Sequence, residues 1–221
     1  MDKIEKPQSI TNEEYRYLNS IRGLSKYFNS KKVGSCMLFG KSFFDTNSDV
    51  SYNNFFNKYM SYSKSEGLPT FKELAEDILS NKVVDIDKDK LVDYIEYRVI
   101  SQTYNGIINE FILMDELNKI YSPEFKCEFS SDESDKKYAI DLILRNTKTQ
   151  EPIIAVQVKP YSFLVGTNPS LMRDKHRIEE KHKQFFKLNN TPVLFYYYGK
   201  EHSLKDFFDR LSVIFLVKSI Y

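Results

Sequence analysis

Apolar residues recur at helical spacing through the first half of the chain and in short strand-like runs through most of the second half. The helical spacing predicts helices over residues 11–30, 51–67, 70–81 and 88–120, because apolar side chains three or four positions apart share one helix face. Thr11 with Glu14, and Thr70 with Glu73, have the spacing of a capping box, which marks the first turn of a helix.

The second half of the chain alternates strands with helices. Apolar runs bounded by polar links predict strands over residues 125–131, 137–146, 152–160 and 191–199. Helices are predicted over residues 170–189, with a cap near Ser170, and over residues 203–219. This order indicates an α/β fold, a mixed β-sheet flanked by helices and preceded by a helical subdomain. We therefore expect a mostly helical N-terminal region at residues 1–86 and an α/β core at residues 87–221.

Composition narrows the classes of protein to consider. The chain has 221 residues, 41% of them hydrophobic, and a net charge of +1, so no global field attracts a polyanion. Cys36 and Cys127 lie in unrelated contexts, which argues against a disulfide framework and against a zinc site. No apolar run is long enough to span a membrane, and the N-terminus lacks the apolar segment of a signal peptide. We expect a cytoplasmic protein without a membrane partner.

Three polar residues interrupt the apolar strands predicted over residues 137–146 and 152–160. Gln157 and Lys159 are two positions apart and therefore share one face of their strand, whereas Val156 and Val158 point into the packed layer. If the two strands are antiparallel neighbours, Asp141 lies beside that pair. Each residue alone also has an ordinary explanation: a paired core carboxylate, an amide that satisfies the backbone, or a solvated lysine at a strand end.

Taken together, these residues resemble the site of the PD-(D/E)xK nuclease superfamily, which includes type II restriction endonucleases, junction resolvases and repair nucleases. The family has an acidic residue on one strand, then an acidic residue, any residue and Lys on the next, and often a Glu from the preceding helix. Asp141, Gln157 and Lys159 occupy the strand positions here, and Glu110 occupies the helix position. The chain departs from the pattern at Ile140, where the family has Pro, and at Gln157, although Gln-x-Lys is a recognised variant among restriction enzymes. The run AVQVKPYSF, followed by a basic helix, is most similar to MjaI-type restriction enzymes.

The resemblance implies a Mg²⁺ site and a division of roles. Asp141 would be the primary ligand, the backbone carbonyl of Val158 a second, and Gln157 would assist, with Glu110 as a further carboxylate. Carboxylate, carbonyl and water oxygens are the ligands that Mg²⁺ prefers. Lys159 would contact the scissile phosphate and orient the attacking water, because a neighbouring Asp opposes the lowered pKa that a lysine base needs.

Two basic segments are candidates for nucleic-acid binding. Residues 22–44 contain five basic residues, no acid, and several aromatic residues, and residues 167–177 follow the candidate site closely in the chain. The alternatives are a solvated helix end with core aromatics for the first segment and an ordinary charged helix face for the second. The candidate DNA-binding residues are Lys31, Lys32, Lys41, Asn168, Arg173, Lys175 and Arg177.

The resemblance therefore implies a type II restriction endonuclease that uses Mg²⁺ to hydrolyse double-stranded DNA at a short palindromic site. A palindrome presents two symmetric half-sites, so we expect a homodimer, with DNA contacts and dimerisation in the N-terminal region. A cognate methyltransferase is expected in the same restriction-modification system. The alternatives are a junction resolvase or repair nuclease of the same superfamily, or a DNA-binding protein without catalytic activity.

Overall fold

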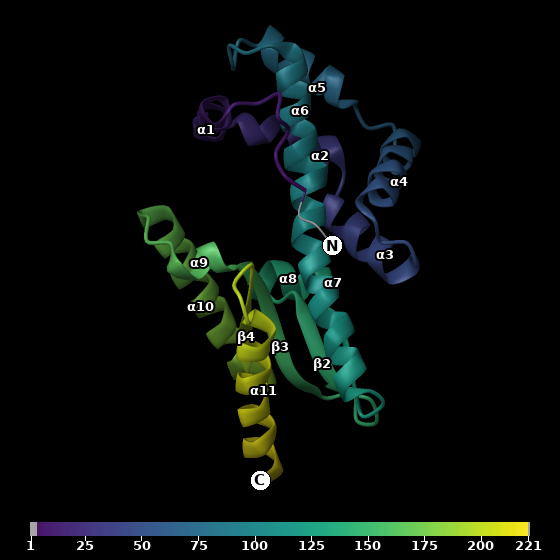
Figure 1. Cartoon of the computed structure of the whole chain (residues 1–221), viewed down its shortest axis with the longest axis vertical. Helices are drawn as coiled ribbons and strands as arrows, with labels where there is room; N and C mark the ends of the chain where they lie inside the picture. The colour runs from purple at the N-terminus through teal and green to yellow at the C-terminus, as the bar shows by residue number, and fades with distance from the viewer. Residues whose placement is uncertain (1–3, 221) are drawn as a thin grey trace. The chain divides into compact units, whose positions relative to one another are not determined.

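The chain divides into two compact units in the computed structural model, which describes residues 4–220 (Figure 1). The N-terminal unit is Met1–Ile108 and the C-terminal unit is Asn109–Tyr221, so the boundary lies inside helix α7 (Gln102–Tyr121). This boundary is later than the division expected between residues 86 and 87. The reason is that the helical stretch beginning at residue 88 buries its first turns in the N-terminal unit, through residues such as Leu91 and Ile95.

The N-terminal unit is helical in every regular element that the described residues form. Both predicted capping boxes are present, at Thr11 with Glu14 and at Thr70 with Glu73. The elements are α1 (Asn12–Ser20), η1 (Leu24–Phe28), α2 (Ser30–Val33), α3 (Cys36–Thr46), α4 (Tyr52–Ser65), α5 (Phe71–Ser80), α6 (Lys88–Glu96) and the π-helical segment η2 (Tyr97–Ser101), which continues into α7.

Aromatic side chains fill the core of the N-terminal unit. Phe55 is fully buried, and its ring centroid lies 5.2 Å from that of Phe43 and 5.3 Å from that of Tyr104. The buried hydroxyl of Tyr59 donates to the carbonyl of Val33 at 2.7 Å, so its polar end is satisfied. Aromatic residues of the first basic segment, such as Phe43, are therefore core residues.

The C-terminal unit is a four-stranded mixed sheet with helices packed on it, as predicted. Strand order is β1-β2-β3-β4, with antiparallel pairing from β1 to β3 and parallel pairing between β3 and β4. The strands are β1 (Phe125–Phe129), β2 (Leu142–Asn146), β3 (Pro152–Pro160) and β4 (Val193–Tyr198); the helices after α7 are α8 (Asp132–Tyr138), α9 (Tyr161–Val165), α10 (Pro169–Asn189) and α11 (Ser203–Ile220).

The strand predicted over residues 137–146 is wrong in its first part, because α8 occupies residues 132–138. Ser131 caps α8 by accepting the N–H of Ser134, and acidic residues in the first turn with lysines in the last turn match the helix dipole. Ala139 then adopts a left-handed conformation with φ of 56°, which ends the helix before β2 begins. The cap of α10 lies two residues before the predicted position, at Asn168 instead of near Ser170.

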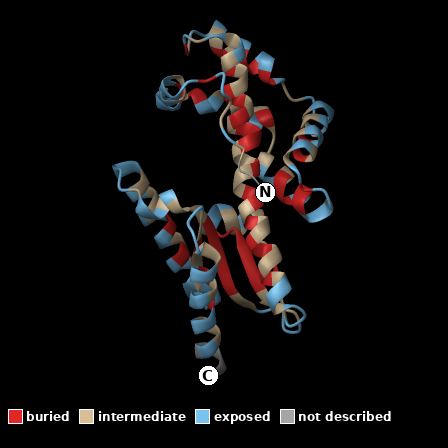
Figure 2. Cartoon of the chain, in the orientation of Figure 1, coloured by how far each residue is buried: buried red, intermediate tan, exposed pale blue. Residues whose placement is uncertain are grey.

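The central strands β2 and β3 are largely buried (Figure 2), and a different cluster of side chains packs on each face of the sheet. Leu144, Val156 and Val158 belong to a large apolar cluster that includes residues of α7 and α11. The opposite face carries a small cluster in which Ala155 packs with Phe185 of α10. None of the described helices is both long and apolar enough to cross a membrane.

Candidate active site

The register of β2 against β3 brings Asp141 to Gln157. Leu142 pairs with Val156, and the N–H of Asp141 donates to the carbonyl of Val156 at 2.9 Å. The carboxylate oxygen Oδ2 of Asp141 accepts the N–H of Val158 at 2.7 Å and the side-chain Nε2 of Gln157. Since β3 continues past the start of β2, this carboxylate takes the place of a strand carbonyl. The predicted antiparallel pairing is confirmed.

Gln157 presents an unusual buried acceptor. Gln157 is 1% exposed, and its Oε1 has no hydrogen-bond partner among the described residues. A buried oxygen without a donor or cation is costly, because its interaction with water is lost and not replaced. Together with the carboxylate of Asp141, this oxygen offers the hard donor chemistry that suits Mg²⁺. The side-chain oxygens of Gln157 and Asp141 therefore have the chemistry of ligands for a divalent metal ion.

Lys159 lies two residues further along β3, on the same strand face as Gln157, as predicted. It is half-buried, and its ammonium group forms no hydrogen bond or ion pair with any residue in the described part of the chain. In the register of β3 with β4, Lys159 pairs with Tyr197. Its charge is therefore held at the end of the sheet without an internal counter-ion.

Glu110 comes from α7 and is buried at 6% exposure. It precedes Leu113 and Leu117, two residues fully buried in the large apolar cluster, by about one and two helical turns. Burial raises the pKa of the Tyr198 phenol, and the nearby negative charges of Glu110 and Asp141 raise it further. The charges of both carboxylates thus raise the pKa of the same phenol, at the end of β4. No group of three His, Cys, Asp or Glu side chains within residues 4–216 is placed to hold a metal ion.

His182 is a residue of this region that the sequence analysis did not select. It is 8% exposed on α10, and its Nε2 lies 3.2 Å from the carbonyl oxygen of Ala139. A carbonyl only accepts, so Nε2 carries the proton. Burial lowers the pKa of His182, the charge of Lys159 lowers it further, and the ring is therefore neutral at pH 7. Its spacing from Ile178 and Phe185, both buried on α10, was the signal for an inward-facing side chain.

The candidate DNA-binding lysines of the N-terminal unit have different surroundings. Lys31 is exposed. Lys32 forms an ion pair with Asp77 at 2.7 Å, and its ammonium lies 5.4 Å from the centre of the Tyr27 ring. Lys41 lies in α3 and is buried, with an exposed fraction of 7%. Of the three, Lys31 presents its side chain most openly to solvent.

The candidates that follow Lys159 are also divided between internal and exposed roles. Asn168 caps α10 by accepting the N–H of Leu171 at 2.9 Å. The ammonium of Lys175 donates to the carbonyls of Leu164 and Gly166, at 2.7 and 2.8 Å, and so ties α10 to the end of α9. Two arginines are exposed, Arg173 and Arg177, the latter in a surface pair with Asp174 at 3.1 Å.

The family model described as MjaI restriction endonuclease matches residues 16–205. That range contains every residue of the candidate active site and parts of both compact units. No curated protein and no solved structure matches the chain.

Proposed function

The chain belongs to the MjaI restriction endonuclease family and is a site-specific deoxyribonuclease, and from this premise we propose that it cuts double-stranded DNA at a short palindromic site with Mg²⁺ in a PD-(D/E)xK site. The observation that carries the proposal is the joining of Asp141 to Gln157 and Val158 at the end of β3, with Lys159 next along the strand. The buried Oε1 of Gln157 supports a cation there.

Four groups would hold the metal: the carboxylates of Asp141 and Glu110, Oε1 of Gln157 and the backbone carbonyl of Val158. When bound, Mg²⁺ supplies Lewis-acid stabilisation of charge on the phosphate and a more acidic water. Within the protein, the N–H of Val158 and the Nε2 of Gln157 orient the Asp141 carboxylate.

Lys159 would contact a non-bridging oxygen of the scissile phosphate and orient the attacking water. The half-buried ammonium has no internal partner among the described residues, so binding a phosphate breaks no existing ion pair. A fixed cation aimed at developing negative charge stabilises the transition state more than the ground state. His182 would position the site indirectly, by donating to the carbonyl of Ala139, two residues before Asp141.

DNA binding and assembly complete the proposal. Arg173 and Arg177, exposed on α10, and Lys31 in the N-terminal unit would contact the DNA backbone or base edges. A palindromic target would be cut by a homodimer, with dimerisation and further DNA contacts in the N-terminal unit. A cognate methyltransferase in the same restriction-modification system would protect the host sites.

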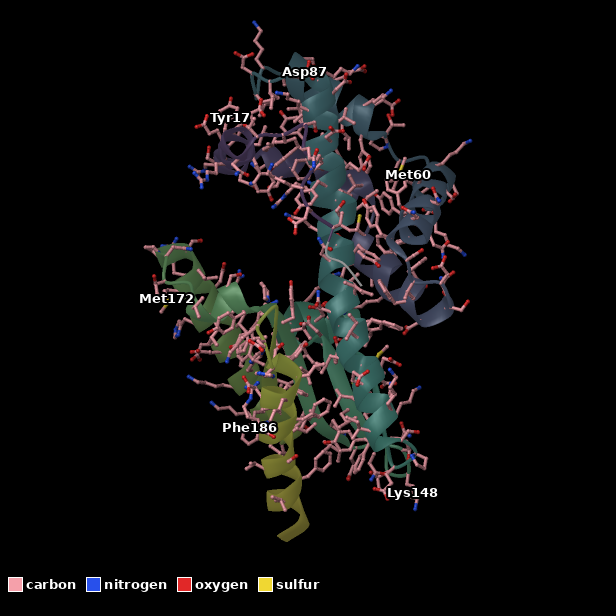
Figure 3. All side chains as sticks on the ribbon, viewed as in Figure 1. Tyr17, Met60, Asp87, Lys148, Met172 and Phe186 are labelled. Atoms are coloured by element: carbon pink, nitrogen blue, oxygen red, sulfur yellow. The ribbon has the colours of Figure 1, made fainter. Side chains whose placement is uncertain are left out.

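The test compares wild type with Lys159→Ala on unmodified plasmid DNA in Mg²⁺. We expect discrete fragments from wild type and none from Lys159→Ala. Lys148→Ala is the matched control, because Lys148 lies in the β2–β3 turn, at the opposite end of the strand pair from Lys159 (Figure 3). It should cut as wild type does. Cleavage by Lys159→Ala at the wild-type rate, or wild-type protein that binds DNA but cuts with neither Mg²⁺ nor Mn²⁺, would contradict the proposal.

A further inference from the structure

A groove of about 620 Å³ runs beside the edge strand β4 of the C-terminal unit. Its lining includes Tyr161 and Leu164 of α9, Tyr197 of β4 and residues of the first turns of α11. Figure 1 shows α9 and the start of α11 at the same end of β4. The volume is within the range of sites that hold small organic ligands.

Aromatic rings form the inner wall of this groove. Tyr197 is half-buried and stacks on Phe195 with ring planes 5° apart and centroids 5.4 Å apart, which holds its ring in a fixed plane. Tyr161 is also half-buried, and the ammonium of Lys200 lies 5.6 Å from the centre of its ring. Flat, fixed aromatic surfaces favour a planar ligand that can stack on them.

The charges around the groove balance. Lys200 pairs with Asp206 at 3.1 Å, so its charge is already neutralised. The guanidinium of Arg210 donates to the carbonyl of Phe195 at 2.8 Å and to that of Asp206 at 3.1 Å. The carboxylate of Asp209 makes no hydrogen bond or ion pair within the described residues. Two cations and two carboxylates give no net attraction for a phosphate, but the open carboxylate can accept from a neutral donor.

Two residues that line the groove lie close to Lys159 in the chain or in the sheet. Tyr161 is the second residue after Lys159, and Tyr197 is the strand partner of Lys159 in the β3–β4 register. A base is separated from its own phosphate by one sugar. A phosphate held at Lys159 therefore brings the base of an adjacent nucleotide within reach of the two tyrosine rings.

We infer that this groove receives a nucleobase that has turned out of the DNA duplex beside the phosphate to be cut. The base stacks on Tyr161 and Tyr197, and Asp209 accepts a hydrogen bond from an amino or imino group on its edge. Stacking and this hydrogen bond offset the loss of pairing and stacking in the duplex. The inference rests on the proposed function, because it requires a duplex bound with its phosphate at Lys159.

The test uses a mismatch scan, since a base that is already unpaired costs less to turn out. The cut site is first mapped by sequencing the ends of plasmid fragments. Duplexes that carry this site, each with one mismatched pair at a different position, are then bound in Ca²⁺, and the dissociation constants are measured by fluorescence anisotropy. For wild type we expect one position next to the cut at which the mismatch tightens binding by about tenfold.

The variants separate this inference from the proposed function. Tyr161→Leu and Asp209→Asn should each lose most of the tightening; Asp209 is exposed and makes no internal contact, so its substitution leaves folding intact. Tyr17→Leu, at a tyrosine 44% exposed in the N-terminal unit, is the matched control and should keep it. If wild type cuts but no mismatch tightens binding, or both groove variants retain the effect, the inference is overturned while the proposed function stands. If wild type produces no fragments with Mg²⁺ or Mn²⁺, the proposed function fails, and the inference with it.

Discussion

The two faces of the sheet in the C-terminal unit differ in what their side chains do. Ile154 and Val156 of β3 point into the large apolar cluster beneath α7 and α11. The residues that alternate with them include Gln157 and Lys159, which lie on the face covered by α10, where His182 is also buried. One strand thus contributes to stability on one face and to chemistry on the other. We expect substitutions on the apolar face to change the free energy of unfolding, and substitutions on the polar face to change cleavage.

The largest effect is expected for Asp141→Asn, which removes a proposed metal ligand charge from the polar face. Cleavage in a single-turnover assay should fall about a hundred- to a thousandfold, a loss typical of removing one electrostatic contributor to a transition state. The asparagine side-chain oxygen can still accept the N–H of Val158, so the urea unfolding midpoint should change little. A variant that cuts within tenfold of wild type would remove Asp141 from the site.

The opposite result is expected for Leu144→Ala on the apolar face. Leu144 is fully buried opposite Ile154, and truncation of a buried leucine costs about 2–5 kcal/mol through lost contacts and a residual cavity. Urea unfolding followed by circular dichroism measures this loss, and cleavage by the folded fraction should stay close to wild type. Leu188→Ala, at a leucine 69% exposed on α10, is the matched control and should be neutral. If Leu144→Ala lowers cleavage without lowering stability, the division between the faces is wrong.

A smaller and mixed effect is expected where the polar face supports the site indirectly. His182→Phe leaves the partly buried Ala139 carbonyl without its donor, at a cost of about 1 kcal/mol, the low end for an unsatisfied group because water can reach it in part. Displacement of the segment before Asp141 should also raise the Mg²⁺ concentration needed for half-maximal cleavage. His182→Gln keeps a side-chain donor and should recover both quantities in part. Equal behaviour of the two variants would limit His182 to packing.

Local geometry explains why much of the site could be predicted from the sequence. The shared face of Gln157 and Lys159 follows from strand alternation alone, and the short polar link before β3 favoured the antiparallel return that brings Asp141 beside them. The helical spacing of Leu91 and Ile95, and the two capping boxes, likewise depend only on neighbours a few positions away.

Features set by distant contacts could not be predicted in this way. His182 meets Ala139 across 43 positions in the chain, and nothing near either residue in the sequence indicates the pairing. In the sequence, Lys41 and Lys175 resemble cations that face solvent. In the fold, Lys41 is buried, and the ammonium of Lys175 donates to two backbone carbonyls. Helix α8 was not predicted: the strand was expected to begin at Lys137, although the acidic first turn and the lysines of the last turn fit a helix that ends at Tyr138.

The smallest expected effect is a pH dependence on the polar face. The pKa of His182 is lowered in the folded state, mainly by burial, with Lys159 and Lys181 lowering it further while the Ala139 carbonyl and Glu179 oppose them. Below about pH 6.5 the histidine of the unfolded chain binds a proton that the folded ring does not. The free energy of unfolding therefore decreases as the pH is lowered, until the pKa of the folded ring is reached. His182→Phe lacks this titration, and all other titrating groups are common to both proteins. The stability advantage of wild type over His182→Phe in urea unfolding should therefore shrink between pH 7.5 and pH 5.5. An advantage that grows over this range would mean that the folded ring is the better proton acceptor, and that the α10 face stabilises a charged histidine beside Lys159.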